Sequence, residues 1–119
     1  RWWRKTFGGG MRQSGILAAA GIYALENNIE RLSEDHIRAS RLAEAVSKMH
    51  SFSVELEAVH SNMVYVQCNE DSAKEVASRL ASRGVDVSEE TDSIVRAVAH
   101  LHITDEDIDR AIEAFEQSQ

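Results

Sequence analysis

The residue best suited to substrate chemistry in this sequence is Arg96, which stands in the apolar run Ile94–His100. A guanidinium group keeps its positive charge at physiological pH, and its planar fork of donors matches the two oxygens of a carboxylate. Arg96 could therefore bind the carboxylate of a small acid or amino acid. From the residues alone, a surface or structural ion pair is the more common role for an arginine in an apolar strand.

Two more basic residues, Lys5 and Arg12, flank the triple glycine Gly8–Gly10. They could contact an anionic substrate or pair with acids elsewhere in an assembly, and the residues favour neither role. The glycines predict a sharp reversal, because glycine adopts positive φ angles without steric cost. A phosphate cradle is not predicted, since the glycines do not follow a strand and lack the Lys-Ser/Thr pair of a P-loop.

Three further residues could carry chemistry but are assigned structural roles. His100 and His102 are predicted to share a strand face, but no third ligand has a spacing that suits a metal. Cys68 is the only cysteine, which excludes an intrachain disulfide and favours a reducing cytoplasm. It is predicted to be a small buried hydrophobe rather than a nucleophile.

Composition limits the partners. The 119 residues carry a net charge of −7, which argues against a general nucleic-acid binder. The first twelve residues are basic and hold no acid, so the acidic excess lies in the rest of the chain. No apolar run is long enough to span a bilayer. The expected partners therefore include neither nucleic acid nor membrane.

The first part of the chain predicts two helices. One runs from near Met11 to Glu26 and is apolar and small on nearly every face, which predicts burial against a partner outside this chain. The other runs from about Ile29 to Met49, with an inner stripe that includes His36 and a solvated face of acids and arginines. We expect a boundary between residues 1–28, which would contact a large domain or another subunit, and a small domain at 29–119.

The second part predicts the order β-β-α-β-β-α. Its expected strands are Ser53–Glu57, Asn62–Cys68, Val85–Val87 and Ile94–His100. A helix over Ser72–Ser82 should be capped near Ser72 and stopped by Gly84, and Thr104 should cap the last helix. The fold class is thus α/β of the α+β kind, with N-terminal helices followed by a small, mostly antiparallel sheet covered by helices on one face.

Three stretches resemble one enzyme family along essentially the whole chain: RKTFGGGMRQSGILAAAGIYALENN, IERLSEDHIRASRLAEAV and IVRAVAHLHITDEDIDRAI. They are similar to low-specificity L-threonine aldolases. The resemblance implies a fold-type-I enzyme dependent on pyridoxal phosphate, usually a cytoplasmic homotetramer. Such enzymes cleave L-threonine or L-allo-threonine to glycine and acetaldehyde.

The resemblance also implies roles for the basic residues. Arg96 matches the arginine that binds the α-carboxylate of the substrate. Lys5 and Arg12 match a basic pair expected near the mouth of an active site, in the same or a neighbouring subunit. Ala99 stands where the family usually has Thr, and His102 where it often has Asp, which weakens any claim for further polar contacts around Arg96.

The same resemblance implies that this chain is a C-terminal fragment of a longer enzyme. In the family the lysine that binds the cofactor lies upstream, and none of Lys5, Lys48 and Lys74 matches it. Pyridoxal phosphate is therefore expected in the full-length parent and not on this chain alone, which we expect to be inactive. Two alternatives stay open, namely a related fold-type-I lyase or aminotransferase-like enzyme, and a non-catalytic α/β module that dimerises.

Overall fold

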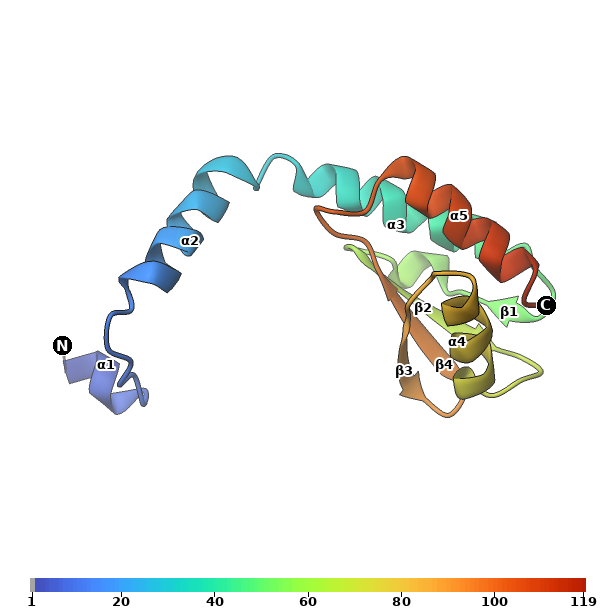
Figure 1. Cartoon of the computed structure of the whole chain (residues 1–119), viewed down its shortest axis with the longest axis horizontal. Coiled ribbons are helices and arrows are strands. Elements are labelled where there is room, and N and C mark those ends of the chain that lie inside the picture. The colour runs from blue at the N-terminus through green and yellow to red at the C-terminus, as the bar shows by residue number, and fades with distance from the viewer. Residues whose placement is uncertain (1) are drawn as a thin grey trace. The chain divides into compact units, whose positions relative to one another are not determined.

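The computed structural model describes residues 2–119 and divides after Leu32 into two compact units. The first unit holds α1 (Trp2–Thr6) and α2 (Gly15–Asn27). The second holds every strand and the remaining helices (Figure 1). The predicted boundary at residue 28 concerns the parent protein and stays a prediction.

The predicted reversal at the triple glycine is present. Gly8 has a φ of +78°, a conformation that favours glycine. At Gly9 a Cβ atom would lie 2.7 Å from Cγ and 2.8 Å from the carbonyl oxygen of Arg4, so a side chain has no room there. The next helix begins at Gly15 and not near Met11, because Gln13 has a φ of 48° and breaks the helical path.

Helix α2 has no buried residue. Its large apolar side chains are all more than half exposed: Ile16, Leu17, Ile22, Tyr23 and Leu25. A helix with apolar side chains in contact with water is usually covered in a complete assembly. Burial against a partner outside the chain stays a prediction. Among residues 2–119, no helix combines the length and apolarity needed to cross a bilayer.

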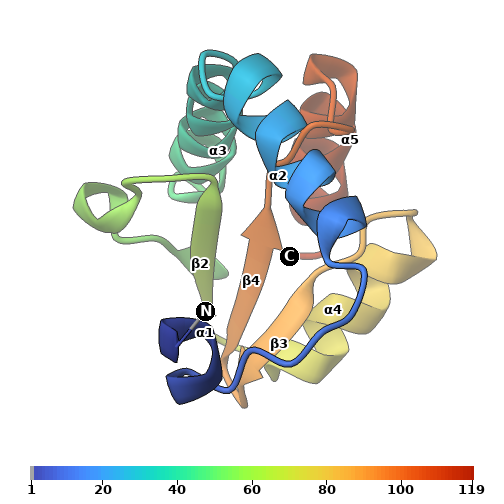
Figure 2. The ribbon, with the colours of Figure 1, turned by 90° about the vertical axis from the view of Figure 1, so that its left-hand side faces the viewer.

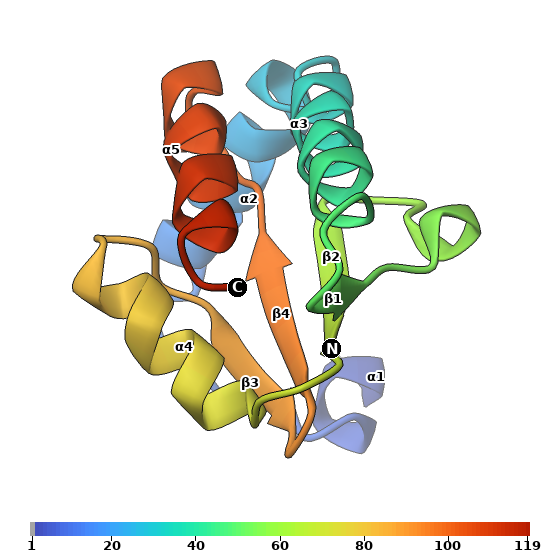
Figure 3. The same ribbon diagram turned by 90° about the vertical axis from the view of Figure 1, so that its right-hand side faces the viewer.

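The second unit is built on a four-stranded antiparallel sheet in the order β1-β2-β4-β3. The strands are β1 (Phe52–Ser53), β2 (Met63–Cys68), β3 (Ser88–Thr91) and β4 (Ile94–Val98). The helices of the second unit cover one face of this sheet (Figures 2 and 3). They are α3 (Leu32–Val46), α4 (Ala73–Ser82) and α5 (Asp105–Glu116), and the predicted fold class is thereby confirmed.

The core lies between the sheet and this helical layer. Alternate residues of the central strands point into it, because successive side chains of a strand face opposite ways. Phe115 of α5 is fully buried, and its ring meets that of Phe52 edge to face with centroids 5.2 Å apart. The other large side chains of the core are Leu42, Val46, Val64, Val66, Val76, Leu80, Val95 and Ile108.

Two strand predictions are wrong. Only Phe52 and Ser53 pair as a strand, and Leu56–Ala58 forms a 3₁₀ helix where alternation predicted strand to Glu57. Val85–Val87 is also not a strand, because the amide of Val85 donates to the carbonyl of Leu80 and closes the end of α4. The polar segment Ser88–Thr91 pairs with β4 instead. Backbone pairing with a buried neighbour outweighs the strand propensity of the edge residues.

The predicted solvated face of α3 is wrong in part. Asp35 is buried, and Arg38 keeps only 16% of its side chain exposed while its Nε donates to Asp105 of α5 at 2.9 Å. Arg41 forms a second bridge to α5 through Asp109. His36, placed in the inner stripe, is exposed. The packing of α5 against α3 therefore uses charged residues that periodicity assigned to solvent.

The predicted ends of α4 and α5 are confirmed. The hydroxyl of Ser72 accepts from the amide of Glu75, and the hydroxyl of Thr104 accepts from the amide of Asp107. Each carboxylate accepts in return from the backbone of the capping residue, which completes a capping box. Gly84 follows α4 with a φ of +79°. Hydrogen bonds from Thr104, first its amide and then its hydroxyl, lower the pKa of Asp107.

We predict that Asp107→Asn destabilises the second unit at neutral pH and has little effect in acid. A carboxyl group whose pKa is lowered by folding stabilises the fold above its unfolded pKa, and the stability is lost as the pH falls through the folded pKa. Urea unfolding of both proteins between pH 7 and pH 3 measures this difference.

The matched control is Glu106→Gln, which removes another acid from the first turn of α5 but no capping bond. It should retain most of the wild-type stability at both pH values. Equal losses for the two variants would mean that the helix dipole, and not the capping bonds, accounts for the effect.

Candidate functional site

Arg96 lies in the middle of β4, on the face of the sheet that the three helices leave open. Its register partners are Tyr65 on β2 and Ser88 on β3. The neighbouring Val95 and Ala97 are buried on the helical side, so strand alternation directs Arg96 the other way. One third of its side chain, 33%, is exposed. A ligand can therefore reach the guanidinium group from the open face.

The guanidinium of Arg96 is already paired in part. Its Nη1 lies 3.2 Å from Oε2 of Glu90, at the end of β3. Its Nε is buried, and within the described residues it has no hydrogen-bond acceptor. Glu90 was not singled out from the sequence, because only the pairing of β3 with β4 brings an acid of the SEET segment to this arginine.

Three large apolar side chains are exposed on the open face around Arg96. Met63 and Tyr65 on β2 and Val98 on β4 are exposed on it. An arginine set among exposed apolar side chains suits a small ligand that combines a carboxylate with a short carbon chain. This arrangement can hold and orient such a ligand.

Lys5 and Arg12 belong to the other unit. Lys5 is in the last turn of α1, and Arg12 is in the segment between α1 and α2; both are exposed. Arg96 belongs to the second unit. A common site for the three basic residues stays a prediction.

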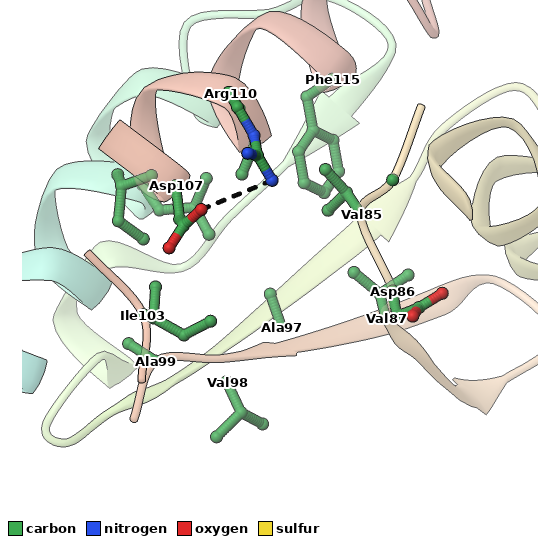
Figure 4. Close-up of a pocket in the computed structure, with 14 residues that line it drawn as sticks. Val85, Asp86, Val87, Ala97, Val98, Ala99, Ile103, Asp107, Arg110 and Phe115 are labelled. Atoms are coloured by element: carbon green, nitrogen blue, oxygen red, sulfur yellow. Dashed lines mark ion pairs between the residues drawn. The ribbon is translucent and has the colours of Figure 1, made fainter. Parts of the chain in front are cut away.

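A pocket of about 190 Å³ lies between α5, β4 and the segment Val85–Val87 (Figure 4). Ala97 lines this pocket. Arg96, the residue before Ala97 in β4, points to the other face of the sheet. Arg110 reaches Asp107 at 3.4 Å along the rim of the pocket. Most of its walls are apolar and come from the core side of α5, β4 and the preceding loop: Val85, Val87, Ala97, Ala99, Ile103, Ile108 and Phe115.

The prediction that His100 and His102 share a strand face is wrong, because β4 ends at Val98. They lie in the turn that follows, where the amide of His102 donates to Nδ1 of His100 at 3.3 Å. The two rings meet edge to face. Across residues 2–119, no group of three or more His, Cys, Asp or Glu side chains is placed to hold a metal ion.

The three lysines lie at the surface of the described residues. Lys5, Lys48 and Lys74 are all exposed; none of them lines the pocket of Figure 4, and Lys48 lies at an open surface hollow with His50 and Glu116. A lysine that holds an aldehyde cofactor is expected in a shielded cavity with partners for the rest of the cofactor. The described residues therefore do not fit a bound pyridoxal phosphate.

The thiol of Cys68 is buried on the helical face of β2, as predicted. Burial first, and then the charge of Asp71, raise its pKa.

We predict that the native thiol of Cys68 reacts with a disulfide reagent at least about tenfold more slowly than the thiol of the urea-unfolded chain. Glutathione in the same solvents is the control for the reagent. Equal rates in the folded and unfolded chain would show that Cys68 is accessible.

This chain is similar to a known protein family and to curated enzymes of several organisms. The family model for beta-eliminating lyases matches residues 1–69. A probable low-specificity L-threonine aldolase 2 of Arabidopsis thaliana is 39% identical over 98% of this chain and 34% of its own length. The low specificity L-threonine aldolase of Escherichia coli K12 is 42% identical over 89% of this chain and 30% of its own length. The chain thus spans about a third of the length of these relatives.

Solved structures share the fold. The cysteine desulfurase CsdA of Escherichia coli matches 92% of this chain and 31% of its own, with a TM-score of 0.76 and 17% identity. The glutamate decarboxylase of Lactobacillus brevis matches 72% of this chain and 22% of its own, with a TM-score of 0.59 and 19% identity. At these identities the likeness concerns the fold alone.

Proposed function

Because this chain belongs to the beta-eliminating lyase family, we propose that it is the C-terminal part of a threonine aldolase. The parent enzyme would cleave L-threonine or L-allo-threonine to glycine and acetaldehyde. Identities of 36–42% to low-specificity L-threonine aldolases over most of the chain support this activity over others in the family. The cytoplasm is the proposed compartment, in keeping with the single buried cysteine.

The observation that carries the proposal is the position of Arg96. One third of its side chain is exposed on the open face of the sheet, beside Tyr65 and other exposed groups. We assign to it the binding of the α-carboxylate of the amino-acid substrate. A guanidinium and a carboxylate can form two parallel charge-assisted hydrogen bonds, which fix the orientation of the substrate as well as its affinity.

The first unit would supply contacts at the edge of the active site and between subunits. Lys5 and Arg12 would lie near the mouth of an active site and contact the substrate or its distal groups. The exposed apolar helix α2 would be covered by the large domain or by another subunit of a homotetramer. The small residues of this helix suit a close approach between backbones.

Pyridoxal phosphate would be held by the part of the parent outside this chain. When bound there, it supplies the electron sink for cleavage of the carbon–carbon bond. The exposure of all three lysines in this chain supports that division. We therefore infer that this chain alone is inactive and that its own contribution is to bind the substrate carboxylate.

Two alternatives remain distinct from this proposal. A related fold-type-I lyase or aminotransferase-like enzyme would share the fold but differ in substrate. Glycine release from threonine, allo-threonine and phenylserine would distinguish it from a threonine aldolase. A non-catalytic module that dimerises through α2 is favoured by the exposure of that helix. Such a module would sediment as a stable dimer and would not restore activity to a truncated aldolase.

The proposal predicts that this chain can replace its counterpart in a relative. We expect a fusion in which it takes the place of the matching segment of the Escherichia coli aldolase to release glycine from threonine. In that fusion, Arg96→Lys should lower kcat/KM by about 10- to 100-fold, because lysine cannot form the bidentate pair. Glycine release under steady-state conditions measures this.

The matched control is Arg110→Lys, at the rim of the pocket beside α5. It replaces a guanidinium group on α5, on the helical side of the sheet, and should leave kcat/KM close to that of the unaltered fusion. If Arg110→Lys caused the loss and Arg96→Lys did not, the substrate would bind on the helical side and the role of Arg96 would be wrong.

A second prediction concerns the cofactor. After incubation with excess pyridoxal phosphate and gel filtration, the 119-residue chain should emerge without cofactor absorbance, whereas the fusion should retain it. Exposed lysines react reversibly and do not hold the cofactor through the column. Stoichiometric retention by the chain, abolished by changing one of its lysines to arginine, would show that it contains a cofactor site.

A further inference from the structure

Arg96 has an acidic partner within its own hairpin. Oε2 of Glu90 lies 3.2 Å from Nη1 of Arg96, which is the distance of an ion pair. The Nε–H of the same guanidinium is shielded from solvent and lacks an acceptor among residues 2–119. A buried donor without an acceptor is unfavourable, so this pairing leaves part of the binding capacity of Arg96 unused.

An irregularity in the hairpin explains how Glu90 reaches Arg96. Ser88 and Glu89 pair in register with Arg96 and Val95, but the register shifts between Glu89 and Thr91. Glu90 thus has no partner directly across the ladder. A bulge of this kind redirects the side chain of the extra residue. Here the carboxylate is directed to the arginine at the centre of the open face.

We propose that Glu90 occupies the carboxylate position on Arg96 when no substrate is bound, and that the substrate carboxylate displaces it. The inference rests on the proposed role of Arg96. It makes Glu90 a determinant of substrate affinity, because each binding event must break the internal pair. Once Glu90 leaves, the guanidinium can turn, and its Nε–H can join a second bond to the incoming carboxylate.

The exposure of the pair makes this exchange feasible. The side chains of Arg96 and Glu90 are 33% and 42% exposed, so water screens their attraction. Ion pairs that are this exposed are weak, and a single contact is weaker than a bidentate one. Removing Glu90 should therefore tighten carboxylate binding only by about two- to fivefold.

Nuclear magnetic resonance of the 119-residue chain can measure this exchange directly. The probe is the Nε–Hε signal of Arg96, assigned by its disappearance in Arg96→Lys. Acetate is titrated in exchange for chloride at constant ionic strength, which removes general salt effects. Glu90→Gln is compared with the wild type and with the control Glu89→Gln. The control removes the same charge from the neighbouring residue, which is the register partner of Val95.

Glu90→Gln should bring the midpoint for acetate to about two- to fivefold lower concentration, and Glu89→Gln should match the wild type. If acetate moves the signal equally in the wild type and Glu90→Gln, the displacement of Glu90 is wrong, whereas carboxylate binding by Arg96 stands. If acetate leaves the signal unmoved in every protein, the proposed role of Arg96 fails and the inference fails with it.

Discussion

The second unit depends on the alternation of side chains along β4, the strand that lies between β2 and β3. Val95 and Ala97 enter the core, which places Arg96 on the opposite face. A shift of one residue in register would bury the guanidinium among apolar side chains, at a high free-energy cost. The register of β4 that packs the core is therefore the same register that exposes Arg96.

The helical layer holds that register in place. Phe115 and the apolar residues of α4 and α5 cover one face of β4, while charged pairs connect α3 to α5 at the outer edge. Capping boxes at both Ser72 and Thr104 set where α4 and α5 begin. The helices of the second unit cover one face of its sheet, and within this unit the face with Arg96 stays open.

The first unit follows a different rule. Its turn requires glycine at positions 8 and 9, one for its φ angle and the other because Arg4 leaves no room for a side chain. Its helix α2 exposes apolar groups that a complete assembly would be expected to cover. This unit is thus shaped locally by its own backbone, and its contacts are proposed to be with the rest of the enzyme.

The sequence by itself determined the elements whose signals are local. Thr104 and Ser72 cap helices through bonds to residues three positions away, and the alternation of β2 and β4 follows from the burial of every second side chain. Only the tertiary structure decided the edge of the sheet, where Ser88–Thr91 pairs with β4 despite its polar residues. It also decided that Glu90 meets Arg96, because an ion pair across a hairpin depends on register and bulge, which residue types do not specify.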